Sequence, residues 1–262
     1  SEFVDLSRLG AVVTKGVANV PWPGNPTPRV AEVYGGMLNA VGLQNPGIDL
    51  FVERDIPFLK QFDTKIMVNV CGHSTEEYIE VVERLRDQPV DLLEINISCP
   101  NVKEGGIAFG QDPKAVEAIT KEMKKHAAQP VITEMARAAE AGGADGLSLI
   151  NTITGMKIDI NRQKFVLANK TGGMSGPAIH PVAVRMVYQT AQAVRLPIVG
   201  MGGIMNAEDA IEMILAGATA VSVGTANFTN PHVTEEIVAG IRDYMERYQV
   251  ADIKDLVGAV HE

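Results

Sequence analysis

One cysteine stands out among the residues that could do chemistry. Cys99 follows a short apolar run and precedes Pro100, and residues 101–111 behind it are rich in glycine, which is typical of a mobile loop. A thiol placed there could act as a nucleophile or as a general base. The alternative is an inert small residue. Cys71, the other cysteine, lies inside a strand-end pattern, so we expect it to serve packing.

Polar residues gather where the apolar runs of this sequence end. Asparagine predominates among them, and its side chain offers both hydrogen-bond donors and an acceptor. Several converging asparagines suit a planar heterocycle or an amide-bearing ligand better than a bare charge. The residues are Thr14, Lys15, Gly16, Asn69, Asn96, Asn101, Asn151 and Thr152.

Two glycine-containing strand ends late in the chain predict a phosphate site. Gly202-Gly203 ends one run shortly before a helix that we expect to begin near Asn206, and Gly224-Thr225 ends the next run. Backbone N–H groups and a helix dipole together bind anions, and barrels of alternating strands and helices build phosphate sites after their last two strands. Glycines that end strands for steric reasons are the alternative. Residues 172–177 could supply further backbone N–H groups.

Lys15 is the basic residue among these strand ends. Its apolar neighbours would desolvate the ammonium in part, so it could pair with a phosphate, polarise a carbonyl or form a Schiff base. A surface lysine is the alternative. We expect His73 at the surface, and the other histidines show no spacing with carboxylates or cysteines that suggests a metal site.

Seven short apolar runs would position these residues, and an amphipathic helical pattern follows most of them. Their nearly continuous apolar character is typical of parallel strands covered on both faces. Ser74 with Glu77 forms a capping-box pattern, and Asp112-Pro113, Asn206 and Asn230-Pro231 mark further helix starts. The predicted strands are Gly10–Gly16, Lys65–Cys71, Asp91–Ser98, Pro130–Thr133, Gly146–Asn151, Pro197–Gly203 and Ala220–Thr225.

Repeated strand–helix units predict a (β/α)8 barrel or an open doubly wound sheet. A barrel needs eight strands. The chain opens on a helix-like piece, Phe3–Leu9, and the Pro130–Thr133 run meets the predicted helix Glu134–Ala141 without a loop. We therefore predict one domain, residues 1–262, folded as a (β/α)8 TIM barrel that lacks its first strand and the end of strand five. An open seven-stranded sheet is the alternative.

Composition excludes several classes of function. The net charge of −9 argues against nucleic-acid binding, which needs a basic surface. No apolar run has the length of a membrane span, and no segment has the pattern of a signal peptide. With only two cysteines in the sequence, we expect a protein of the reducing cytoplasm. Two cysteines exclude a disulfide scaffold and cannot ligate an ordinary iron–sulfur cluster.

Four segments of the sequence resemble dihydroorotate dehydrogenases, in the same order and over essentially the whole chain. The resemblance is greatest to the catalytic subunit of the two-subunit, NAD-dependent bacterial form (class 1B), especially over Trp22–Arg29 and Asn101–Gly110. The four segments are Asn25-Pro-Thr-Pro-Arg29, Met37-Leu-Asn-Ala-Val-Gly-Leu-Gln-Asn-Pro-Gly47, Asn96-Ile-Ser-Cys-Pro-Asn-Val102 and Gly200-Met-Gly-Gly203.

The resemblance implies an FMN enzyme that oxidises dihydroorotate to orotate in pyrimidine synthesis. Cys99 matches the base that removes the C5 proton while a hydride leaves C6 for the flavin. The implied substrate residues are Lys15, Asn39, Ala40, Val41, Gly42, Leu43, Asn96, Asn101, Asn151 and Thr152. The implied FMN residues are Lys15, Gly16, Asn69, Asn96, Ile150, Gly176, Gly202, Gly203, Gly224 and Thr225.

The resemblance also implies a partner subunit that carries FAD and an iron–sulfur cluster and passes electrons to NAD, with a homodimer of this chain inside a heterotetramer. Two family features have no counterpart here: an N-terminal strand with a glycine-rich turn against the flavin, and a lysine at the end of strand five, where Thr133 meets Glu134. Both coincide with the gaps found by counting strands.

Four alternatives stay open. One is a one-subunit form that reduces fumarate, and another is a tRNA dihydrouridine synthase, against which the acidic charge counts. The third is a non-redox lyase that forms a Schiff base at Lys15, and the fourth is a non-catalytic scaffold.

Overall fold

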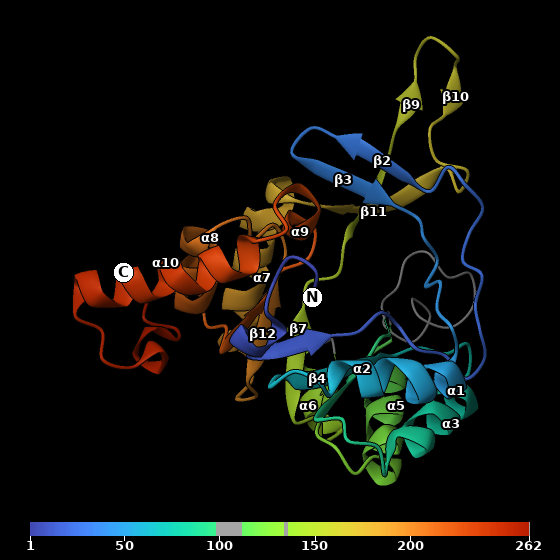
Figure 1. The fold of residues 1–262 in the computed structure, drawn as a ribbon, viewed down its shortest axis with the longest axis horizontal. Coiled ribbons are helices and arrows are strands. Elements are labelled where there is room, and N and C mark those ends of the chain that lie inside the picture. Colours follow the sequence, from blue (N-terminus) through green and yellow to red (C-terminus); the bar gives the residue numbers. More distant parts are fainter. Residues whose placement is uncertain (98–111, 134–135, 262) are drawn as a thin grey trace.

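A curled, seven-stranded parallel sheet forms the centre of the protein, with helices on its outer side (Figure 1). The computed structural model describes residues 1–97, 112–133 and 136–261. In the sheet the strands follow one another in chain order, and each pairs with its neighbour in parallel. They are β1 (Ala11–Val13), β4 (Lys65–Val70), β5 (Leu92–Ile95), β6 (Val131–Thr133), β7 (Gly146–Leu149), β12 (Ile198–Met201) and β13 (Ala220–Ser222).

The strand order distinguishes between the two predicted architectures. A doubly wound sheet reverses its strand order partway along, whereas this sheet runs from β1 to β13 without a reversal. All seven predicted strands are confirmed, and the sheet curls as a barrel wall does. Strands β1 and β13 are its two edges. The described chain is thus a partial (β/α)8 barrel, and the doubly wound alternative is wrong.

Most helices begin where the sequence predicts. The side chains of Ser74, Asp112 and Asn206 each accept a hydrogen bond from a backbone N–H in the first turn of the following helix. The helices on the outside of the sheet are α3 (Thr75–Leu85), α5 (Pro113–His126), α6 (Ala136–Ala141), α7 (His180–Ala191), α8 (Ala207–Leu215) and α10 (Val233–Tyr248). Within this series α3 contacts α5, α5 contacts α6, α7 contacts α8 and α8 contacts α10.

Two helix predictions need correction. The last long helix begins at Val233, because Asn230 ends the short helix α9 (Ala226–Thr229) and its side chain accepts a hydrogen bond from the His232 N–H (3.0 Å). The N-terminal piece forms a 3₁₀ turn over Leu6–Arg8. Further turns are α1 (Ile48–Leu50), a π-helical turn (Phe51–Asp55), α2 (Ile56–Leu59) and 3₁₀ turns over Pro177–Ile179 and Ile253–Leu256.

A small antiparallel sheet, which the sequence did not predict, stands beyond the carboxyl ends of the barrel strands (Figure 1). It is built from two excursions of the chain, one after β1 and one after β7. In order across the sheet its strands are β2 (Val30–Val33), β3 (Gly36–Asn39), β11 (Thr171–Ser175) and β8 (Ile153–Met156), with a projecting hairpin of β9 (Ile158–Asp159) and β10 (Lys164–Phe165). The two excursions bring residues near 39 and near 152 together over one end of the barrel.

The main core lies between the strands and the surrounding helices. Ile66, Leu93, Ile95 and Leu147 are almost wholly buried there, and the apolar faces of α3 and α5 pack against them. Among the described residues, no helix is both long enough and apolar enough to cross a lipid bilayer.

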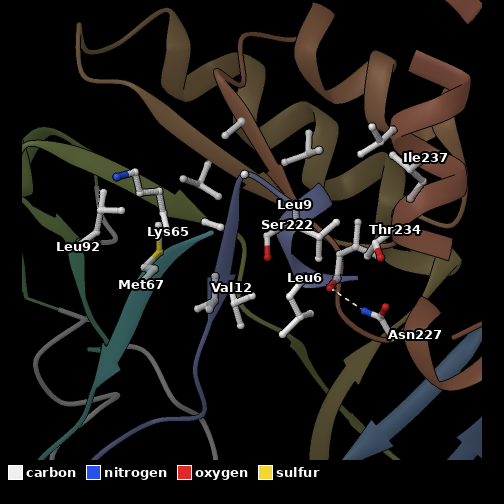
Figure 2. A pocket seen from close by; sticks show the side chains of 18 of the residues that line it. Leu6, Leu9, Val12, Lys65, Met67, Leu92, Ser222, Asn227, Thr234 and Ile237 are labelled. Carbon is white, nitrogen blue, oxygen red and sulfur yellow. Dashed lines mark hydrogen bonds between the residues drawn. The ribbon is translucent and has the colours of Figure 1, made fainter. Parts of the chain in front are cut away.

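A groove of about 850 Å³ opens between the two edge strands (Figure 2). Its walls come from the edges, as with Val12 and Ser222, and from Leu6 and Ile237 beside them, while Met67 belongs to an interior strand. In a closed barrel, side chains fill this interior and both edges are paired. The groove is therefore the unclosed interior of the barrel at the position of an eighth strand, and its apolar lining follows from that.

Candidate active site

A polar cavity of about 260 Å³ lies at the carboxyl ends of β1, β4, β5 and β7, beside the small sheet. Nearly all residues predicted to touch the substrate or the flavin ring line it. The lining residues are Thr14, Lys15, Gly16, Asn39, Val41, Gly42, Leu43, Asn69, Asn96, Asn151 and Thr152. Four asparagines from four separate segments thus converge on one small space, as a planar polar ligand would require.

A hydrogen-bond chain crosses the floor of this cavity. Glu94, buried in β5, accepts a hydrogen bond from Asn69 Nδ2 (2.5 Å). Asn69 Oδ1 in turn accepts from Asn96 Nδ2 (3.1 Å). The hydroxyl of Tyr78, from α3, donates to the main-chain oxygen of Asn96 (2.6 Å). Two strands and one helix therefore fix the two asparagines.

The segment after β1 forms one wall. The Thr14 hydroxyl accepts from the Asn69 N–H (3.2 Å), which ties this segment to β4. Lys15 is exposed and lines the cavity. Gly16 is buried, and a Cβ there would lie 3.1 Å from Asn69 Oδ1 and 3.2 Å from Cys71 Sγ. Cys71 is buried in a small apolar cluster, which agrees with a packing role.

The small sheet and its neighbours form the opposite wall. Asn39 ends β3, and its Nδ2 donates to the Gly173 oxygen (3.5 Å). Asn151 Oδ1 accepts from the Thr152 N–H (2.7 Å) and from the Thr152 hydroxyl (3.3 Å), which fixes the two neighbouring side chains with respect to each other. Residues 41–43 line the cavity, whereas Ala40 is buried and does not.

The predicted phosphate-binding residues gather at a second place, at the ends of β12 and β13. Gly202 and Gly203 have φ angles of 130° and 70°, in the region that favours glycine. A Cβ on Gly203 would lie 2.7 Å from the Gly176 oxygen, so these glycines pack backbone against backbone. The Thr225 hydroxyl donates to Ser175 Oγ (2.6 Å), which brings the end of β13 to the same place.

Two further predicted residues lie close to this cluster. Ile150 is buried, and its N–H donates to the Met201 oxygen (3.0 Å), one residue before the glycine pair. Gly224 is exposed and precedes Thr225. The structure therefore assembles Ile150, Gly176, Gly202, Gly203, Gly224 and Thr225 in one region, separate from the polar cavity lining.

Cys99 and Asn101 lie outside the described residues, so their predicted roles stay predictions. Among the histidines, His73 is exposed and contacts Trp22, with ring centroids 4.1 Å apart and ring planes tilted by 57°. Within the described residues no group of histidine, cysteine and carboxylate side chains could hold a metal ion.

Sequence reasoning missed three residues that hold the site together: Glu94, Tyr78 and His180. Glu94 had a detectable signal, because a carboxylate in the apolar run Leu92–Ile95 requires a buried partner. His180 begins α7, and its Nδ1 bonds to the Gly202 oxygen (2.9 Å) while Nε2 lies 3.1 Å from Glu212 Oε2. Through the bond to Gly202, His180 stabilises the turn at Gly202-Gly203.

The fold and the cavity together define a class of protein: a partial (β/α)8 barrel with a polar cavity at its strand ends and a glycine cluster beside it. Comparison with known proteins gives the family. The family model "Dihydroorotate dehydrogenase" matches residues 1–245. The chain belongs to the dihydroorotate dehydrogenase family.

Similar proteins extend this result. A protein of Lachnoclostridium phytofermentans, named dihydroorotate dehydrogenase B (NAD(+)), catalytic subunit, is 69% identical over 270 residues, covering 99% of this chain and 90% of that protein. A protein of the same name from Alkaliphilus metalliredigens is 61% identical over 269 residues, covering 99% and 89%. A crystal structure of DHODH from Eimeria tenella in complex with ferulenol shares the fold, with a TM-score of 0.82, 20% identity, and coverage of 97% of this chain and 79% of that one.

Proposed function

We propose that this protein oxidises dihydroorotate to orotate with FMN, as the catalytic subunit of an NAD-dependent two-subunit enzyme. The observation that carries the proposal is the convergence of Lys15 and four asparagines on one cavity, with a glycine cluster beside it. The names of the two relatives described above support both the reaction and the partner.

The residues present fit FMN. A Cβ on Gly224 would meet nothing within 4 Å, so the backbone at the end of β13 is open to a phosphate, while Gly203 packs beside it against the Gly176 oxygen. In the polar cavity Asn96 Oδ1 is buried without a hydrogen-bond partner among the described residues, so it is ready to accept from a ring N–H. Gly176, Gly202, Gly203, Gly224 and Thr225 would hold the ribityl-phosphate arm, and Lys15, Gly16, Asn69, Asn96 and Ile150 the ring.

The chain's own residues would divide the work of the reaction. Asn39, Asn96, Asn101, Asn151 and Thr152, with Lys15 and the segment 40–43, would orient the substrate ring and its carboxylate. The Cys99 thiolate would take the C5 proton, and FMN, when bound, accepts the hydride that leaves C6. Loss of the proton and the hydride leaves a C5–C6 double bond, so the product is orotate. Cys99 returns its proton to solvent before the next turnover.

The proposal assigns the later electron transfer to another protein. Two cysteines cannot ligate an iron–sulfur cluster, so a partner subunit with FAD and such a cluster would carry electrons to NAD. A homodimer of this chain within a heterotetramer is the proposed assembly.

Spectroscopy on the purified protein tests the reaction. FMN supplied to the protein should give a bound flavin band, and dihydroorotate added without oxygen should bleach it. Cys99→Ser should slow this bleaching by a factor of at least about 100, the scale of general-base catalysis, while FMN stays bound. Cys71→Ala, which removes the other thiol, is the matched control and should retain most of the rate. Bleaching at the same rate in Cys99→Ser would remove Cys99 from the mechanism, and a protein that never binds FMN would refute the proposed function.

A second measurement tests the partner. Without the partner, dihydroorotate should reduce an artificial dye but not NAD. NAD reduction by this chain alone would contradict the two-subunit assignment.

A further inference from the structure

Glu94 is a buried carboxylate at the base of the polar cavity, and the reaction described above gives it no task. It lies in the middle of β5 with 7% of its surface exposed. Its carboxylate accepts a hydrogen bond from Asn69 Nδ2. Glu94 takes part in none of the ion pairs found within residues 1–97, 112–133 and 136–261. A charge in such a place needs a reason, because burial disfavours it.

The chemistry of a carboxylate supplies that reason. An ionised carboxylate can only accept hydrogen bonds, so Asn69 must turn its NH₂ group toward Glu94. The Asn69 oxygen then points the other way, and it can only accept. Asn96 must therefore turn its own NH₂ group toward Asn69, as the 3.1 Å bond shows. One charged residue thus determines the orientation of two amide groups that are otherwise free to flip.

The last member of this series of hydrogen bonds, Asn96, lies at the cavity. Asn96 lines it, and its Oδ1 is buried without a hydrogen-bond partner within the described part of the chain. The main chain of Asn96 cannot rotate to relieve this, because the Tyr78 hydroxyl holds its carbonyl oxygen (2.6 Å). A buried acceptor of this kind is stable when a ligand brings the donor.

We propose that Glu94 is a positioning residue: it sets the direction of the Glu94–Asn69–Asn96 chain, so that Asn96 offers an acceptor to a ring N–H of a planar ligand. The inference rests on the proposed function, which supplies two such ligands, the pyrimidine ring of the substrate and the isoalloxazine ring of FMN. A glutamine at position 94 could donate as well as accept, so both asparagines could flip and Asn96 could present its NH₂ group instead.

Ligand discrimination provides the test. The probes are orotate and orotate analogues in which a ring oxygen replaces one ring N–H, which keeps the shape and removes the donor. Their affinities for the FMN-loaded protein would be measured by titration calorimetry, and the affinity for FMN itself by fluorescence. The variants are Glu94→Gln, Glu94→Asp, which remains an obligate acceptor, and Glu117→Gln, an exposed control on α5.

If the substrate is the donor, the wild type should prefer orotate to one analogue by at least about tenfold. Glu94→Gln should lose most of that preference, whereas Glu94→Asp and Glu117→Gln should keep it. If FMN is the donor, the preference stays and Glu94→Gln instead weakens FMN binding by about tenfold, with recovery in Glu94→Asp. Either pattern supports the proposal and identifies the ligand.

A folded Glu94→Gln with unchanged preference and unchanged FMN affinity would overturn the inference. If Glu94→Gln does not fold, Asn69→Ala replaces it, because loss of the middle amide also cuts Glu94 off from Asn96. Loss of the orotate preference relative to Glu117→Gln would then support the inference, and an unchanged preference with an unchanged FMN affinity would overturn it. The proposed function fails separately: it fails if the wild type binds neither orotate nor FMN.

Discussion

Replacement of Tyr78 by phenylalanine should destabilise the protein measurably through one hydrogen bond. Tyr78 lies on α3 with 0% of its surface exposed. Its hydroxyl donates to the main-chain oxygen of Asn96 at 2.6 Å, a short distance for a neutral pair. Phenylalanine keeps the ring in the core and removes the hydroxyl alone, so the packing contribution is nearly unchanged.

The size of the effect follows from what remains behind. A typical internal hydrogen bond contributes about 1 kcal/mol net, and a buried acceptor left without its donor costs about 1–3 kcal/mol. We therefore expect Tyr78→Phe to lower the free energy of unfolding by about 2 kcal/mol. For a chain of this size that corresponds to a fall in Tm of about 4–8 °C. Release of the Asn96 main chain should also weaken orotate binding.

Urea unfolding followed by circular dichroism is the assay, with Tyr188→Phe as the matched control. Tyr188 lies on α7 and is 41% exposed, so water can replace the hydrogen bonds of its hydroxyl when the hydroxyl is removed. The same chemical change at the two positions isolates the buried bond. A free energy of unfolding for Tyr78→Phe within about 0.5 kcal/mol of Tyr188→Phe, the scatter of surface substitutions, would refute the reasoning.

Two further predictions concern the glycine turn and the pH dependence of the free energy of unfolding below pH 7. Gly203→Ala should weaken FMN binding, and it should lower the free energy of unfolding by more than Gly143→Ala does. Both glycines have a positive φ, but only at position 203 would the added Cβ lie 2.7 Å from a carbonyl oxygen. Equal losses of the two variants on urea unfolding would contradict this. Burial raises the pKa of Asp91, but hydrogen bonds from the Ile66 N–H and Lys65 outweigh it and hold this pKa below its ordinary value. A lowered pKa stabilises the fold above the ordinary aspartate pKa, and this contribution disappears as pH falls through the folded-state value. The difference in free energy of unfolding between wild type and Asp91→Asn should therefore shrink from pH 7 to acid, and a constant difference would count against the assignment.

The barrel was predictable because its signals are local. Strands such as Lys65–Val70 are nearly continuous apolar runs, and helix starts such as Ser74 and Asn206 depend on a side chain that caps the first turn. The small sheet was not predictable in this way. Its strands are four or five residues long and pair across the chain, as Gly173 does with Asn39, so their stability comes from contacts that no single segment contains.

The same distinction applies to the site. Asparagines and glycines at strand ends could be identified one by one, and the structure brings most of them to one cavity or to the glycine cluster beside it. Glu94, Tyr78 and His180 form hydrogen bonds with those residues from neighbouring strands or helices. Their importance depends on which neighbour each one meets. Composition and spacing carry no information about that.

The position of the opening explains how a partial barrel can still form this cavity. Strand β1 is an edge, so the segment that carries Lys15 is held from one side, by β4. Three backbone hydrogen bonds join this segment to β4 and its end. The Thr14 N–H donates to the Met67 oxygen (3.0 Å), and the Val17 N–H donates to the Asn69 oxygen (2.8 Å). In return, the Val17 oxygen accepts from the Cys71 N–H (3.0 Å). These bonds continue the parallel ladder past the end of β1. The cavity wall is therefore fixed by the same strand that carries Asn69, and it does not require a partner on the open edge.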